Sequence, residues 1–220
     1  MIVADEKEFI FVHIPRTAGT RISKSLCQAM GIDDWKQYIG EPTEVARRHE
    51  TVREGYPGST YEGKKHIKAK DLKSLVGGEK WESYFKFAFV RNPWDRAVST
   101  YMHRRKVAPR LVKAIWPTSR RLFRWLLKAK YKLLRAESTQ QVDYVTDGEG
   151  KLLVDFIGRF ECLSKDFDVV CDRISVDAEL GERYDPTKRR NYQEYYDEPC
   201  RRIIQDAKRD DIERFGYCFE

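Results

Sequence analysis

Two short stretches of the sequence combine side chains that suit the binding of phosphate or another anion. The first, HIPRTAGT, brings Arg16 and small hydroxyl residues together directly after the apolar run 8–14. A turn between a strand and a helix directs backbone N–H groups and the positive helix end toward an anion. Thr17 and Thr20 add hydroxyl donors, and Arg16 adds a charged fork of N–H donors. A Walker A pattern is absent, and an ordinary strand-to-helix connection is the alternative.

The second stretch, FAFVRNPWDRAVSTY, places Arg91 directly after the apolar run 85–90. Ser99 follows eight positions later, about two helical turns, so the two side chains can share one face. Open α/β sheets bind ligands outside the carboxyl ends of their strands, where an arginine and a hydroxyl would hold a second phosphate. In the alternative interpretation Arg91, Asp95 and Arg96 form a structural ion-pair cluster, and for Asp95 and Arg96 that interpretation is preferred.

Both stretches need a strand that runs into a helix. The runs 8–14 and 85–90 are rich in β-branched and aromatic residues, which predicts two buried strands. Asn92 suits a helix N-cap and Pro93 the first helical position, which predicts a helix to about residue 105. Strands that alternate with helices indicate an α/β fold of three layers with a mostly parallel central sheet. Further elements are expected at 21–30, 69–76, 152–160, 164–174 and 197–214.

The chain has 220 residues, which favours one large domain spanning 1–220. Its net charge is +7, from 42 Lys and Arg against 35 Asp and Glu. Twelve of the cations and none of the acids lie between Arg104 and Arg135, leaving 30 basic and 35 acidic residues elsewhere. We therefore interpret 104–135 as a basic helical insertion. Charges recur there at 120, 124, 128, 132 and 135, and apolar residues at 122, 126, 129 and 133.

Four interpretations of the basic segment 104–135 stay open. It is a solvated helix face, a groove for an acidic glycan, an interfacial helix on an anionic membrane, or a salt-sensitive surface for nucleic acid without sequence specificity. No apolar run approaches the roughly 20 residues of a membrane span, and no signal peptide is recognisable. Five scattered cysteines without a CxxC pair favour reduced thiols over disulfides or a metal site. These features predict a cytoplasmic protein, with peripheral membrane contact as an option.

The two motifs, in this order and about seventy residues apart, resemble the phosphate-binding signatures of the carbohydrate sulfotransferases. That family includes the heparan 2-O- and chondroitin sulfotransferases and small bacterial relatives. The similarity extends to VDFIGRFECLSKDF and to YYDEPC and DDIERFGYCF near the end, so it covers most of the chain except 104–135. The resemblance implies a P-loop-like architecture. It also implies transfer of a sulfuryl group from 3′-phosphoadenosine 5′-phosphosulfate (PAPS) to a hydroxyl of a carbohydrate or sugar-bearing acceptor, without a metal.

The resemblance also implies roles for individual residues. His66 would be the general base, at the position where related enzymes carry a catalytic histidine, although an exposed histidine in a basic loop is the alternative. Arg16 would neutralise the leaving group, where the family usually has lysine after the proline. Lys188 and Arg189 would close over the nucleotide. The 5′-phosphosulfate would be held by Pro15, Arg16, Thr17, Ala18, Gly19 and Thr20, and the 3′-phosphate by Arg91 and Ser99.

Two other functions remain compatible with the sequence. A P-loop kinase-like nucleotide enzyme would share the fold, but the Walker A lysine and a paired acidic magnesium site are missing. A non-catalytic adaptor would bind anionic polymers or membranes through the segment 104–135. Of the other histidines, His13 is expected to be a packed residue or to support the site from behind, and His49 and His103 lack supporting context. The acceptor and the oligomeric state do not follow from the sequence.

Overall fold

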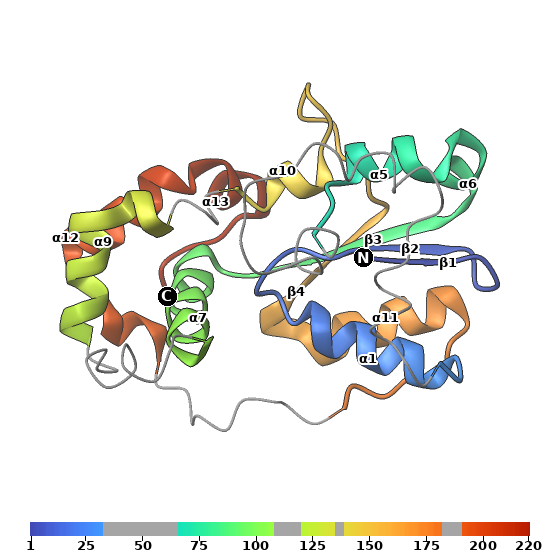
Figure 1. Cartoon of the computed structure of the whole chain (residues 1–220), viewed down its shortest axis with the longest axis horizontal. Coiled ribbons are helices and arrows are strands. Elements are labelled where there is room, and N and C mark those ends of the chain that lie inside the picture. Colours follow the sequence, from blue (N-terminus) through green and yellow to red (C-terminus); the bar gives the residue numbers. More distant parts are fainter. Residues whose placement is uncertain (33–65, 108–119, 135–138, 182–190) are drawn as a thin grey trace. The chain divides into compact units, whose positions relative to one another are not determined.

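The computed structural model describes residues 1–32, 66–107, 120–134, 139–181 and 191–220 (Figure 1). Contacts within these ranges divide the chain into two compact units. Unit 1 comprises Met1–Val90 and Asp143–Tyr184, and unit 2 comprises Arg91–Val142 and Asp185–Glu220. The first motif thus belongs to unit 1, whereas the second crosses the boundary: its strand residues up to Val90 lie in unit 1, and Arg91 with the helix that follows lies in unit 2. A single domain with a basic insertion at 104–135 stays a prediction.

Unit 1 is built on a sheet that, within the described ranges, has four strands in the order β1-β2-β3-β4. Strand β1 pairs antiparallel with β2, whereas β2, β3 and β4 are parallel, with Phe9 opposite Phe85 and Phe87 opposite Phe156. The predicted mixed α/β class with a mostly parallel sheet is therefore confirmed. The sequence analysis missed β1. The strands are β1 (Ile2–Ala4), β2 (Phe9–Val12), β3 (Phe85–Val90) and β4 (Phe156–Arg159).

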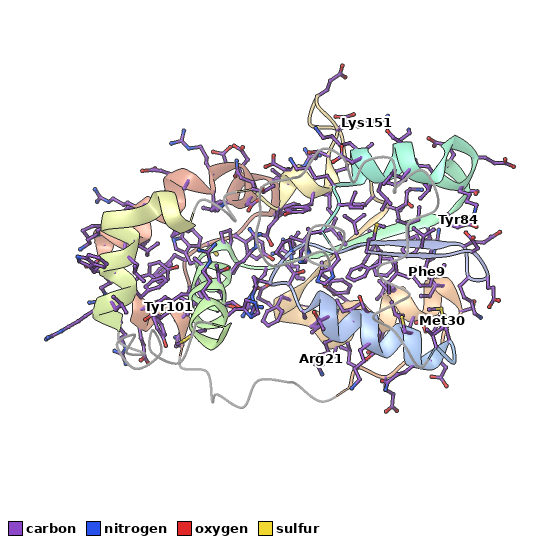
Figure 2. All side chains as sticks on the ribbon, viewed as in Figure 1. Phe9, Arg21, Met30, Tyr84, Tyr101 and Lys151 are labelled. Atoms are coloured by element: carbon purple, nitrogen blue, oxygen red, sulfur yellow. The ribbon has the colours of Figure 1, made fainter. Side chains whose placement is uncertain are left out.

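Helices cover both faces of this sheet: α1 and α11 lie on one side, and α5 and α6 on the other (Figure 1). Every residue of β2 is buried, as expected for a parallel strand with both faces covered. Phe9, labelled in Figure 2, lies on the side of α1 and α11 and packs in one cluster with Ile22 and Phe167. These helices are α1 (Gly19–Ala29), α5 (Ala69–Val76), α6 (Gly78–Ser83) and α11 (Leu163–Ile174), with the short η3 (Phe160–Cys162) before α11 and α10 (Val142–Val145) where the units meet in sequence.

Unit 2 is helical in its described part and has an aromatic core of its own. Tyr101 of α7, labelled in Figure 2, is buried with Phe123 of α9 and with Tyr196. The ring centroids of Phe123 and Tyr196 are 5.2 Å apart, in an edge-to-face arrangement that aromatic pairs favour. None of the described helices combines the length and apolar character that a membrane span needs. The elements are α7 (Pro93–Val107), α9 (Arg120–Leu134), η4 (Tyr192–Tyr195), α12 (Glu198–Ala207) and α13 (Arg209–Phe215).

The buried face of α9 differs from the one that the spacing predicts. Phe123 and Leu127 are fully buried, whereas Leu122 and Leu126 of the expected apolar face are only half-buried. Leu126 of the expected face packs against the core of unit 2, but the fully buried stripe lies one residue further on, because the partner aromatic rings lie there. Phe123 contacts the rings of Tyr101 and of two tyrosines at 195 and 196.

The charged face of α9 contacts unit 2 itself. Arg120 pairs with Glu194, the Nε of Arg124 donates to the carbonyl of Tyr195 at 3.0 Å, and the Nζ of Lys128 lies 2.8 Å from the Asp197 carboxylate. Three cations of the segment 104–135 are thus engaged within the unit. These contacts give the basic helix a structural role before any external partner is considered.

Replacement of Asp197 by alanine is expected to destabilise unit 2 by about 1 kcal/mol at neutral pH, the usual cost of losing a helix cap. Asp197 is the N-cap of α12: one carboxylate oxygen accepts from the Cys200 N–H at 3.0 Å and the other contacts Lys128. Hydrogen bonds from Cys200, and then from Lys128, hold the pKa of the Asp197 carboxyl below its usual range.

Because the folded-state pKa of Asp197 is lowered, its stabilising effect is complete above the unfolded value and disappears as the pH falls toward the folded one. Urea unfolding of Asp197→Ala and wild type should therefore differ at pH 7 and converge below about pH 4. The matched control is Asp206→Ala, which removes an exposed carboxylate 3.8 Å from Arg209 and should change little. Equal losses from both variants would contradict the capping role.

Candidate functional site

The turn between β2 and α1 has an unusual backbone. Arg16 and Ala18 both take left-handed torsions, with φ of 70° and 69°, and Thr17 between them is not among the residues of positive φ. Left-handed torsions at residues other than glycine cost about 1–3 kcal/mol each and tend to occur at functional sites. Alternation of this kind makes successive N–H groups converge into a concavity that suits an anion.

Helix α1 begins directly behind this turn without a local negative charge. Ala18 is its N-cap, no side chain caps the helix there, and the first turn contains no acidic residue. The cap and the first turn of α1 thus supply no negative charge to the positive end of the helix. The strand, left-handed turn and helix start together form the arrangement predicted for the first motif.

The hydroxyl of Thr17 serves the turn itself. Its Oγ1 donates to the carbonyl of Ile14 at 3.0 Å, and the residue is fully buried. The hydroxyl proton is therefore engaged in closing the turn, and the group that Thr17 offers to an anion is its backbone N–H. Thr20, by contrast, is exposed, and Pro15 and Arg16 are half-buried.

Gly19 is required because the ring of His13 fills the space that a side chain would occupy. A Cβ on Gly19 would lie 2.0 Å from His13 Cδ2 and 2.1 Å from His13 Nε2, well inside van der Waals contact. His13 itself is 2% exposed, so its ring has nowhere open to move. The expectation that His13 is a packed residue behind the turn is confirmed.

His66 lies against this same turn in unit 1. Its Nδ1 is 2.9 Å from the carbonyl oxygen of His13, and the two imidazole rings meet edge to face with centroids 4.6 Å apart. A carbonyl oxygen can only accept, so this hydrogen bond requires a proton on Nδ1 and leaves Nε2 of neutral His66 with its lone pair. The structure thus brings together two elements that the sequence separates by 53 positions.

Arg91 opens unit 2 in a buried setting. It is 3% exposed, and its Nε donates to the Asp95 carboxylate at 2.7 Å. Asn92 caps α7 as predicted, because its Oδ1 accepts from the N–H groups of Trp94 and Asp95 at 3.1 and 3.4 Å. The ion pair predicted for Asp95 is confirmed, and one effect of that pair is to fix the direction of the Arg91 guanidinium. Ser99 is buried on α7, about two turns further along.

Comparison with known proteins identifies the group to which these motifs belong. A sequence model described as the Sulfotransferase family matches residues 1–218, almost the whole chain. The chain belongs to the sulfotransferase family. An uncharacterized protein of Archaeoglobus fulgidus is 27% identical over 121 residues, which are 55% of this chain and 92% of that protein. No solved structure matches significantly.

Some predicted residues of this sulfotransferase lie outside the described ranges. Lys188 and Arg189, expected to close over the nucleotide, and His49 belong to this group, so their roles stay predictions. Within the described ranges, no cluster of His, Cys, Asp and Glu side chains could hold a metal ion. The residues that the structure brings together in unit 1 are His66 and His13, and the ring of His13 in turn lies against Gly19 of the turn.

The sequence analysis overlooked two polar residues of this sulfotransferase that reach the second motif. Gln141 hydrogen bonds to the backbone of Arg91, and Asp211 of α13 hydrogen bonds to Gln141. Both side chains are fully buried. Asp211 lies within DDIERFGYCF, one of the stretches that carry the resemblance, but nothing distinguishes it there from the aspartate beside it, and Gln141 stands next to another glutamine. The backbone carbonyl of His13, which orients His66, was likewise invisible to reasoning from side-chain types.

Proposed function

We propose that this sulfotransferase moves a sulfuryl group from PAPS to a hydroxyl of a carbohydrate or of another sugar-bearing acceptor. The observation that carries the proposal is the hydrogen bond from His66 Nδ1 to the carbonyl of His13, the residue whose ring packs against Gly19 of the turn. A base next to an anion-binding turn is what transfer of sulfate to a hydroxyl requires. Membership in the sulfotransferase family supports the same chemistry.

The donor groups of the chain suit a nucleotide with phosphates at two positions. We assign the 5′-phosphosulfate to the turn from Pro15 to Thr20, whose uncapped helix start and converging N–H groups favour an anion. We assign the 3′-phosphate to Arg91 and Ser99, both buried at the start of unit 2. The succession of β2, turn and α1 supports a P-loop-like architecture, and Lys188 with Arg189 remains our candidate for the groups that close over the nucleotide.

The chemistry divides between donor and protein. When bound, PAPS supplies a sulfuryl group, so that one S–O bond forms to the acceptor oxygen while the bond to the 5′-phosphate oxygen breaks. His66 takes the acceptor's hydroxyl proton on Nε2, and the His13 carbonyl stabilises the resulting imidazolium through the Nδ1–H. Backbone N–H groups of the turn stabilise negative charge that develops on the phosphate side.

Arg16 has the charge needed to neutralise a leaving phosphate, but its shape differs from the lysine usual in the family. A lysine ammonium is a compact point donor, whereas a guanidinium is a planar fork that favours two parallel contacts. The left-handed φ of 70° at Arg16 sets where this side chain leaves the turn. We therefore assign Arg16 to charge neutralisation on phosphate oxygens.

The nucleotide assignment is tested by binding of adenosine 3′,5′-bisphosphate, measured by isothermal titration calorimetry without metal. We expect Arg91→Ala to weaken this binding at least tenfold, about what the loss of one charge-assisted hydrogen bond produces. Arg202→Ala removes an exposed arginine that pairs with Glu198 and serves as the charge-matched control. Absence of binding to the wild type, or equal effects of both variants, would overturn the assignment.

A further inference from the structure

The buried side chain of Gln141 hydrogen bonds to both backbone groups of Arg91, its N–H and its carbonyl. The Oε1 of Gln141 accepts from the Arg91 N–H at 2.9 Å, and the Nε2 of Gln141 donates to the Arg91 carbonyl at 2.8 Å. Gln141 is 0% exposed and Arg91 is 3% exposed. A side-chain amide thus satisfies both backbone groups of Arg91, a residue of the second motif that lies fifty positions away in the chain.

Asp211 accepts a further hydrogen bond from this amide in the same orientation. Its Oδ2 accepts from Gln141 Nε2 at 3.4 Å, and its Oδ1 accepts from the Val142 N–H at 2.8 Å. The amide cannot flip without loss, because a flip would set Oε1 of Gln141 against the Arg91 carbonyl and Nε2 against the Arg91 N–H. Asp211, Gln141 and Arg91 therefore form a chain of hydrogen bonds with one consistent assignment of donors and acceptors.

Burial of such a polar cluster costs desolvation free energy that an apolar core would not, which argues for a role beyond packing. Burial raises the pKa of the Asp211 carboxyl, and the charge of Arg96 partly offsets that effect. An apolar side chain would occupy the same volume without desolvating a carboxylate. What an apolar side chain could not do is fix the backbone torsions of Arg91 through its N–H and carbonyl groups.

The side chain of Arg91 is oriented separately, by the contact of its Nε with Asp95 at 2.7 Å. Asp95 sets the guanidinium relative to α7, whereas Gln141 sets the peptide groups from which the side chain leaves. A long side chain amplifies small changes in backbone direction, and misplacement by about 1 Å can cost a factor of 10² in a positioned site. Both constraints are needed to hold the N–H donors of the Arg91 guanidinium in one position.

We propose that Gln141 and Asp211 are positioning residues that aim Arg91 at the 3′-phosphate and thereby set the preference of the enzyme for a 3′-phosphorylated nucleotide. This inference rests on the proposed function, since it takes Arg91 as the 3′-phosphate ligand. It adds that selectivity for that phosphate depends on two side chains that belong to neither sequence motif and contact Arg91 only through its backbone or through each other.

The test variant is Asp211→Asn, which keeps the shape of the side chain. An asparagine that accepts from the Val142 N–H turns its own amide N–H groups toward Gln141 Nε2, so that two donors face each other. The double variant Gln141→Glu with Asp211→Asn restores complementarity there, because the Asn amide can donate to the Glu carboxylate and the Arg91 N–H keeps its acceptor. It keeps the net charge but leaves the Arg91 carbonyl without its Gln141 donor.

The neighbouring residues provide a matched control. Gln140 donates to Asp210 in a neighbouring pair, one position earlier in each segment than Gln141 and Asp211. Asp210→Asn makes the same chemical change as Asp211→Asn, but on Gln140, which meets Asp211 through the Asp211 backbone N–H at 3.3 Å. It should leave nucleotide selectivity as it is in the wild type.

The measurement is the ratio of the Kd for adenosine 5′-phosphate to the Kd for adenosine 3′,5′-bisphosphate, two ligands that differ by the 3′-phosphate alone. We expect Asp211→Asn to lower this ratio at least tenfold, on the order of one charge-assisted hydrogen bond, with the Kd for adenosine 5′-phosphate nearly unchanged. The double variant should fall between Asp211→Asn and wild type. General loss of structure would weaken both ligands alike and leave the ratio unmoved.

The outcomes separate this inference from the proposed function. A wild type without preference for the bisphosphate would defeat the proposed function itself. A wild type with that preference, and a folded Asp211→Asn that retains it, would overturn the positioning role while leaving the function standing. Should Asp211→Asn not fold, the double variant decides, because a wild-type ratio in it would overturn the inference and a reduced ratio would support it.

Discussion

Replacement of His66 by alanine is expected to lower the rate of sulfuryl transfer by a factor of about 10² to 10⁴, the usual contribution of a general base. Nε2 of His66 is the basic nitrogen because Nδ1 is engaged with the His13 carbonyl at 2.9 Å. The affinity for adenosine 3′,5′-bisphosphate should stay within about twofold, since the role proposed for His66 is toward the acceptor and not the nucleotide. Initial rates with labelled PAPS and calorimetry on the same preparations measure the two effects separately.

Two further variants distinguish a base from a merely structural histidine. His66→Asn keeps an N–H donor for the His13 carbonyl but has no nitrogen that can take a proton, so its rate should also collapse. His103→Ala, which removes a half-buried histidine of α7 in unit 2, should leave the rate unchanged. A wild-type rate in His66→Asn would mean that a group other than His66 takes the proton of the acceptor hydroxyl.

The parts of the site that can be predicted from the sequence are those formed by residues close together in the chain. A buried apolar run, a turn of small residues and a helix start are neighbours in the chain, so the first motif could be located before any contact was known. The same holds for Asn92, because an N-cap bonds to N–H groups two and three positions ahead. The pairing of Arg91 with Asp95 follows from helical spacing as well.

The parts that sequence reasoning missed depend on contacts between distant segments. The sequence analysis named His66 but not the group that holds it, because that group is a backbone carbonyl, which every residue has. Gln141 and Asp211 lie seventy positions apart, and their environment, not their type, distinguishes them from their exposed neighbours. For α9 the spacing predicted a helix correctly, but its inward face depends on aromatic rings of other segments, which amphipathic periodicity does not describe.

Gly19→Ala is expected to destabilise the protein by about 3 kcal/mol, near the upper end for overpacking a core, and to reduce transfer activity with it. Alanine normally stabilises a helix relative to glycine by about 1 kcal/mol, so the predicted sign is the reverse of the intrinsic one. The cause is the overlap of the new Cβ with the ring of His13, 2.0 Å away. His13 is 2% exposed and its carbonyl holds His66, so strain on the ring reaches the base.

The control is the same substitution at the first residue of another helix in unit 1. Gly78 begins α6, and no atom lies within 4 Å of the position that a Cβ would take there, so Gly78→Ala should be neutral or stabilising by up to about 1 kcal/mol. Denaturant midpoints give the two stabilities, and transfer rates at a temperature where both variants are folded give the two activities. If the ring of His13 is the cause, Gly19→Ala should lose stability and Gly78→Ala should not. A Gly19→Ala variant as stable and active as Gly78→Ala would mean that the ring can leave the turn, and the route by which the turn orients His66 would then have to run through another group.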